Sequence, residues 1–226
     1  MRTGVPLVEL IREAWRYGLE HRAEFADALG DHLFLVGIAL GISILLCVPL
    51  GIWTSRAGTA ATPVMSVITG LRSLPSLAVL FVLIPYLGLS LRSAALALTL
   101  LAMPPILINT DAAFRTIDAA VLEAARAMGM TTRQVLFRVE IPLALPVVLA
   151  GIRTAAVEVL SSATLAAFVG SGGLGIYITR GFALFDYTIL FVGAVPLAAL
   201  TLIAEVVLTG LARAAEPPGH STAKGV

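Results

Sequence analysis

The sequence predicts an all-α fold, a polytopic membrane helical bundle with five core transmembrane helices. Of its 226 residues, 58% are hydrophobic and only 13% are charged, and the mean hydropathy is +0.97. Soluble domains average about 45–50% apolar and about 25% charged residues. The chain also holds several apolar runs near the roughly 20 residues that one helical span requires. The apolar composition predicts a lipid membrane as the surrounding medium, and a net charge of +1 gives no electrostatic reason to expect a nucleic-acid partner.

The first 31 residues mix charges with apolar residues at helical spacing, which predicts an amphipathic N-terminal lead-in (1–31) lying at the membrane interface. Arg72 separates two uncharged runs that are together too long for one upright span, and Pro75 should break the helix there. We therefore expect a helix before Arg72 and a span after it. The five predicted spans, which share an apolar composition, are 33–53, 74–90, 93–110, 143–165 and 187–209.

These spans define a predicted membrane domain over residues 32–212. One long polar loop, 111–142, interrupts the domain between the third and fourth spans. The remaining residues, 213–226, contain Pro217 and Pro218 and few apolar side chains, so they are predicted to form a disordered tail.

The polar loop carries the signals of two short helices joined at a glycine. Asp118 is placed to cap the first helix, and Gly129 suits the left-handed position that ends it. Thr131 and Gln134 have the spacing of a capping box for the second helix. Pro142 is expected to mark the turn into the fourth span.

The string from Glu123 resembles the EAA loop of binding-protein-dependent ABC importers. The residues at its motif positions are Glu123, Ala124, Ala125, Gly129, Val139, Ile141 and Pro142. The resemblance implies a type I ABC importer permease whose loop forms a coupling helix for a cytoplasmic ABC ATPase. It assigns that coupling role to Glu123, Ala124, Ala125, Gly129, Ile141 and Pro142. It also implies that the loop is cytoplasmic, which with five spans places the N-terminus outside.

Two further strings, RSLPSLAVLFVLIPYLG (72–88) and VGSGGLG (169–175), resemble other signatures of the same superfamily. Within it, PPILINT (104–110) and AGIRTA (150–155) resemble the osmoprotectant branch. The resemblance implies a cell inner membrane permease for glycine betaine, choline or carnitine. Its partners would be the ATPase, an external solute-binding protein and a second permease chain, identical or different. A permease for methionine or another amino acid is the alternative, because methionine-type permeases share several of these elements.

No motif predicts catalytic, cofactor-binding or metal-binding residues, so we expect that the chain is not an enzyme. A Walker A sequence is absent and the single lysine is Lys224, so any ATP would be used by the partner subunit. The glycines at 170, 172 and 175 fit a dinucleotide pattern but lack its βαβ setting, which favours a tightly packed external loop. An intramembrane enzyme and a passive channel remain as alternatives outside the importer class.

Four charges are expected at membrane depth: Arg72, Arg153, Glu158 and Glu205. Such groups are costly in a membrane and are usually paired or face a cavity. Arg153 and Glu158 are about 140° apart around a helix, so each needs a partner from another span or from a second subunit. An ion pair is the preferred interpretation, and lining of a translocation pathway is the alternative.

Overall fold

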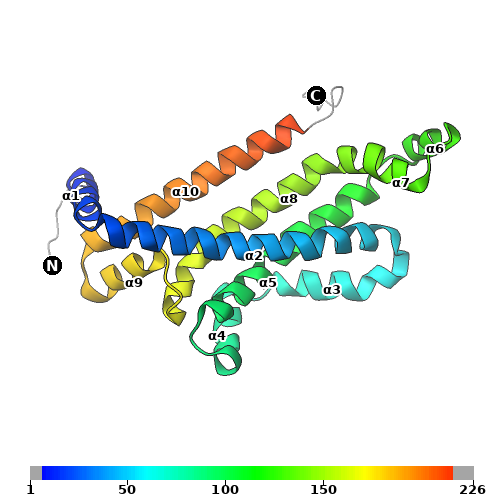
Figure 1. The fold of residues 1–226 in the computed structure, drawn as a ribbon. Helices are drawn as coiled ribbons and strands as arrows, with labels where there is room; N and C mark the ends of the chain where they lie inside the picture. The colour runs from blue at the N-terminus through cyan, green and yellow to red at the C-terminus, as the bar shows by residue number, and fades with distance from the viewer. Residues whose placement is uncertain (1–6, 216–226) are drawn as a thin grey trace.

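The structure, a computed structural model, describes residues 7–215, and every regular element in that part of the chain is a helix (Figure 1). The longer helices are α1 (Leu7–Glu20), α2 (Arg22–Arg56), α3 (Thr62–Leu71), α4 (Ser76–Leu87), α5 (Leu91–Arg115), α6 (Ala119–Ala127), α8 (Ile141–Ser162), α9 (Gly175–Leu184) and α10 (Tyr187–Ala214). The short elements are the 3-10 helices η1 (Gly58–Ala61) and η3 (Ala163–Val169), the single turn α7 (Thr132–Val135) and the π-helix η2 (Leu136–Glu140).

Four helices between residues 7 and 215 are long and apolar enough to cross a membrane. They are α2, α5, α10 and the continuous helix Thr132–Val169, which contains α8. A fifth crossing exists if the stretch Gly58–Leu71 and α4, which meet at an angle of 101°, together form one broken span. The predicted five-span bundle is confirmed with its second span in this broken form.

Two helix bounds differ from the prediction. The first spanning helix begins at Arg22 rather than near residue 33, because charges do not end a helix whose backbone hydrogen bonds continue beyond the apolar region. The predicted span at 74–90 corresponds to α4, which has 12 residues and is about 18 Å long at 1.5 Å per residue. That is shorter than the roughly 30 Å of a bilayer core, so α4 does not cross alone.

Helix α5 lies at the centre of the bundle and is the most buried of the four long helices. Its most extensive contacts are with α2 and α8, and a glycine on each neighbour lets the backbones approach. A Cβ on Gly51 of α2 would lie 2.6 Å from Thr110 Cβ, and one on Gly151 of α8 would lie 2.6 Å from Asn109 Cβ. Small residues at such crossings are typical of helix packing in membranes.

The two ends of the bundle differ in content. Figure 1 shows α6 and α7 beyond one end, and α1 and α9 at the other. At the α9 end the glycine-rich loop packs closely on the start of the bundle: a Cβ on Gly172 would lie 2.7 Å from Asp31 Oδ2. His32 is fully buried beneath this loop, with its Nε2 3.2 Å from the Leu160 carbonyl oxygen. This agrees with the prediction of a tight loop rather than a nucleotide site.

The terminal segments bear on two further expectations. Part of the predicted lead-in is the helix α1, which exposes Val8, Trp15 and Leu19; its place at a membrane interface stays a prediction. Of the predicted disordered tail, residues 216–226 lie outside the described residues, and α10 continues to Ala214.

Candidate functional site

Helix α6 is closed at both ends by the residues that the sequence indicated. Asp118 Oδ1 accepts a hydrogen bond from the Ala120 N–H at 2.9 Å. At the other end Gly129 has a φ of +82°. The Gly129 N–H donates to the Arg126 carbonyl at 2.9 Å, and the Met130 N–H donates to the Ala125 carbonyl at 3.3 Å. This pair of bonds is a Schellman motif, so the predicted glycine stop is confirmed.

The single turn α7 begins with the predicted capping box. The Thr131 N–H donates to Gln134 Oε1 at 2.8 Å, and the Gln134 N–H donates to Thr131 Oγ1 at 3.4 Å. Helices α6 and α7 contact each other, and their buried side chains are Ala125 and Val135. Together, residues 118–135 form a compact two-helix unit, which we call the α6–α7 unit.

The residues predicted for coupling are distributed over this unit and the start of α8. Glu123 and Ala124 are exposed on α6, beside the exposed side chain of Met128, whereas Ala125 is buried. Ile141 and Pro142 open α8, where Ile141 is half-buried and Pro142 is exposed. The structure therefore leaves Glu123, Ala124 and Met128 available at the free surface of α6.

The turn expected at Pro142 is absent. The chain stays helical from Thr132 to Val169, and Pro142 lies in the first turn of α8. Within this continuous helix Pro142 has no N–H to donate to the turn before it. The irregularity lies just before it, where η2 forms a π-helix over Leu136–Glu140.

A group of polar contacts lies where the ends of α2 and α5 meet η2, and two of these contacts join residues far apart in the sequence. Arg56 at the end of α2 forms an ion pair with Glu140 of η2. Arg115 at the end of α5 binds Asp111 through two contacts of 2.8 and 3.1 Å and donates to the Thr54 carbonyl at 3.2 Å. We call these five residues (Thr54, Arg56, Asp111, Arg115 and Glu140) the base. Its carboxylates are about nine-tenths buried, with side-chain exposures of 10% for Glu140 and 9% for Asp111.

The four charges of the membrane region fall into two groups. Arg153 lies 3.5 Å from Glu205 Oε1 and donates to Thr209 Oγ1 at 3.0 Å, so α8 is bridged to α10. For Arg153 the expected ion pair with another span is present. Arg72 and Glu158 are both exposed, and neither has an ion-pair partner within the described residues.

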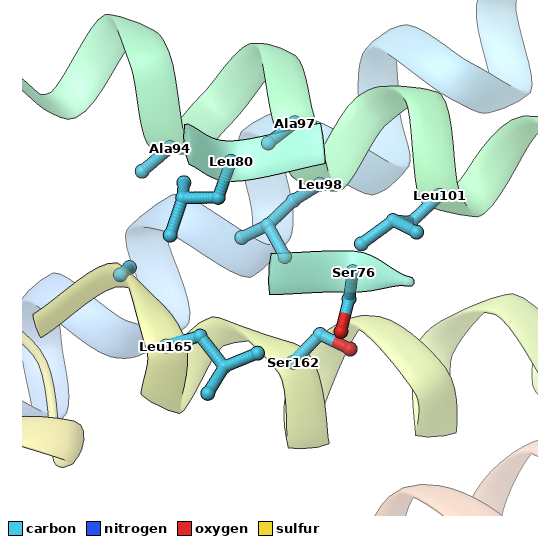
Figure 2. Close-up of a pocket in the computed structure, with 9 residues that line it drawn as sticks. Ser76, Leu80, Ala94, Ala97, Leu98, Leu101, Ser162 and Leu165 are labelled. Atoms are coloured by element: carbon cyan, nitrogen blue, oxygen red, sulfur yellow. The ribbon is translucent and has the colours of Figure 1, made fainter. Parts of the chain in front are cut away.

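Arg72 stands at the break between α3 and α4, where residues 72–75 are exposed and outside regular helix. Just beyond the break, Ser76 and Ser162 direct their hydroxyls toward one another at the edge of a small pocket between α4, α5 and α8 (Figure 2). The pocket volume of about 10 Å³ is close to the minimum for one water molecule. It is too small to hold a solute, but it brings the broken span and the end of α8 together.

A larger open hollow of about 570 Å³ lies between η1, α3 and the last residue of α5. It is lined by Gly58, Ala61, Thr62, Met65, Ser66, Thr69 and Arg115. Three of these residues carry hydroxyls that recur at helical spacing on α3, so the open face of α3 is polar from η1 up to the break.

A family model described as "Binding-protein-dependent transport system inner membrane component" matches residues 47–217. The chain belongs to this family. The matched region includes the broken span, the α6–α7 unit, α8 and α10, so it covers both the base and the unpaired charges. The permease is thereby placed among inner membrane components, as the EAA loop and the apolar spans indicated.

Curated relatives of the permease carry osmoprotectant names. It is 40% identical over 178 residues to the carnitine transport permease protein OpuCB of Listeria monocytogenes, covering 79% of this chain and 82% of that protein. It is 38% identical to the glycine betaine/carnitine/choline transport system permease protein OpuCB of Bacillus subtilis, covering 87% and 91%. The osmoprotectant import permease protein OsmW of Salmonella typhimurium is 36% identical, covering 90% and 97%.

Among solved structures, the fold is similar to an inward-facing MetNI methionine ABC transporter. The TM-score is 0.78 with 22% identity, covering 88% of this chain and 99% of that chain. A crystal structure of an amino acid ABC transporter gives a TM-score of 0.62 with 18% identity, covering 94% and 98%. At these identities the likeness concerns the fold, which is that of an ABC importer permease.

Proposed function

We propose that this chain is the permease subunit of an ABC importer that carries a quaternary-amine osmoprotectant such as glycine betaine, carnitine or choline. The observation that carries the proposal is the identity of 36–40% to permeases named for these solutes, over most of both chains. A separate ATPase drives the cycle, an external binding protein delivers the solute, and a second permease chain completes the pathway.

The α6–α7 unit supports the coupling part of the proposal. It projects beyond the bundle (Figure 1), and its own caps hold it in shape. The alanines of α6 permit close approach of an ATPase surface, while Glu123 offers a charge to a basic group there. A rigid element of this kind passes movement of the ATPase to the bundle without absorbing it. This assignment puts α6 on the cytoplasmic side and α1 outside.

The broken span supports the pathway part. Backbone outside regular helix is tolerated at membrane depth only where protein covers it or where it lines a water-filled cavity. Interrupted spans are for the same reason pointers to transport sites. We assign the translocation face to the break at 72–75 together with the exposed face of α8 that carries Glu158, with the second permease chain forming the opposite wall.

The alternative solutes and classes are less well supported. The methionine transporter shares the fold at 22% identity, whereas the osmoprotectant permeases share 36–40% of the sequence. An intramembrane enzyme needs several polar groups converging in a pocket, but the small pocket of Figure 2 offers two hydroxyls among apolar side chains. A passive channel would have no use for a preformed docking unit.

The test is reconstitution of the complete complex in proteoliposomes with its ATPase and binding protein. We expect uptake of glycine betaine, carnitine or choline that requires both ATP and the binding protein. Uptake of methionine alone would favour the amino-acid alternative, and flux that continues without ATP would favour a channel. Reporter fusions at Ala61 and Thr131 should be cytoplasmic and one at Gly172 external; the reverse pattern would contradict the orientation.

A further inference from the structure

Two charges of the translocation face have no ion-pair partner among residues 7–215. Arg153 shows how the fold treats an ordinary charge in the membrane region: it is bound to Glu205 and Thr209. Arg72 and Glu158 have opposite signs and are exposed, yet no ion pair joins them in the structure. An ionisable group at membrane depth is usually paired or faces a cavity. The exposure of both charges therefore points to a cavity that contains a charged species for part of the cycle.

The two side chains belong to the same place in the bundle. The break and the end of α8 meet at the pocket of Figure 2, where Ser76 and Ser162 face each other. Arg72 precedes Ser76 by four residues, and Glu158 precedes Ser162 by four, which is about one turn of α8. A cation and an anion thus each lie four residues before a serine of this pocket, on two different elements.

The chemistry of the pair fits a zwitterion. A guanidinium binds a carboxylate through two parallel N–H···O bonds. A quaternary ammonium has no N–H to donate, so a carboxylate holds it by charge alone. Glycine betaine and carnitine carry both groups, whereas choline carries the ammonium and a hydroxyl in place of the carboxylate.

We propose that Arg72 and Glu158 form a transit subsite for zwitterionic quaternary amines, in which Arg72 binds the solute carboxylate and Glu158 faces its ammonium group. The assignment rests on the proposed function and specifies its solute subclass. Arg72 then acts as a specificity residue that favours carboxylate-bearing solutes, and Glu158 acts on every solute with the cationic head. The subsite belongs to the pathway and is separate from capture by the external binding protein.

The experiment compares uptake of glycine betaine and choline by the reconstituted complex, each at a concentration below saturation. The readout is the ratio of the two initial rates for each variant. This ratio does not depend on how much complex has assembled, and the unchanged binding protein contributes equally to every variant. The variants are Arg72→Gln, Arg72→Lys and Glu158→Gln, with Arg92→Gln as the control because Arg92 is an exposed arginine at the start of α5.

We expect Arg72→Gln to lower the betaine-to-choline ratio on the order of tenfold, the effect of losing one charge-assisted hydrogen-bond partner. Arg72→Lys keeps the charge without the bidentate geometry and should lower the ratio less. Glu158→Gln should slow uptake of both solutes and leave the ratio near that of the wild type. If Arg72→Gln fails to assemble, the Arg72→Lys ratio decides, and a wild-type ratio there overturns the assignment.

Other outcomes separate the subsite from the proposed function. Equal losses of betaine and choline uptake in Arg72→Gln, or the same fall in ratio in Arg92→Gln, would overturn the subsite while leaving the importer intact. Uptake of choline but not of glycine betaine by the wild-type complex would also overturn the subsite and leave the importer intact. A wild-type complex that transports neither solute nor carnitine would overturn the proposed function, and the subsite with it.

Discussion

The α6–α7 unit and the base beneath it are held together by contacts of opposite range. The bonds that close the unit join residues no more than five positions apart, such as Ala125 and Met130. In the base, Arg56 meets Glu140 across 84 positions and Arg115 meets Thr54 across 61. The unit is therefore shaped by its own sequence, whereas its attachment depends on the whole bundle being folded.

In the proposed coupling role, movement applied to α6 would leave the locally closed unit undeformed and would reach α8 through η2. The base then connects η2 with the ends of α2 and α5. Substitutions in the base should therefore affect the whole permease, and substitutions in the unit should affect α6 and α7 alone.

The largest effect is expected from Arg56→Ala, which leaves the Glu140 carboxylate buried without its partner. Loss of the partner of this buried carboxylate should lower the free energy of unfolding by about 1–3 kcal/mol. A larger loss is not expected, because Arg56 is half exposed and water already screens the pair. Thermal unfolding of the purified permease in detergent measures this. Arg138→Ala is the matched control, since Arg138 is exposed on the same π-helix. Equal free energies of unfolding for the two variants would show that the base does not stabilise the permease.

Gly129→Val should act on α6 without weakening the bundle. A β-branched residue at a φ of +82° is strained by about 1–3 kcal/mol, which should fray the last turn of α6. We expect faster amide exchange in α6 and reduced solute-stimulated ATP hydrolysis in the full complex. Gly41→Val, at an open helical position in α2, should change neither. A loss of global stability in Gly129→Val would contradict the local character of the unit.

Thr131→Ala removes one half of the capping box and should destabilise α7 by about 1 kcal/mol. Hydrogen exchange of the α7 amides reports this loss. Thr132→Ala, one position along and exposed, keeps the cap and serves as the control. If both variants exchange at the same rate, the capping box contributes nothing to the unit.

The smallest change in stability is expected from Glu123→Ala, because an exposed surface substitution usually alters stability by less than about 0.5 kcal/mol. Binding of the ATPase to the permease should nevertheless weaken, which a pull-down titration measures. Glu24→Ala, an exposed acid at the opposite end of the bundle, should leave this binding unchanged. Normal ATPase binding by Glu123→Ala would remove Glu123 from the docking surface.

The sequence was informative where structure is determined within a few residues. Asp118, Gly129 and the Thr131–Gln134 pair each occupy a position whose backbone demands that residue type, so the ends of α6 and the start of α7 could be predicted. Apolar composition likewise predicted the number of spans. The break after Arg72 followed from Pro75, which now forms the N-cap of α4 with extended backbone.

The features that the sequence did not predict depend on tertiary contacts or on the absence of a stop signal. Nothing between Arg22 and residue 33 tells a helix where to begin once its apolar part is anchored, so the start of α2 was missed. Arg56 and Glu140 are ordinary charges in the sequence, and only the packing of α2 against η2 makes them a pair. Arg153 was expected to have a partner on another span, but the sequence did not show that this partner is Glu205, because the pair depends on the contact between α8 and α10.

The π-helix at Leu136–Glu140 sets the rotational position of α6 and α7 relative to α8. A π-turn accommodates one residue more than an α-turn, and each residue of an α-helix corresponds to about 100° of rotation and 1.5 Å of advance. Conversion of this one turn to regular α-helix would thus rotate α6 and α7 by about 100° around the axis of α8. The alanine surface of α6 would then point away from its present direction while every span kept its sequence, whereas a deletion of one residue within η2 would remove the extra residue and leave that direction unchanged.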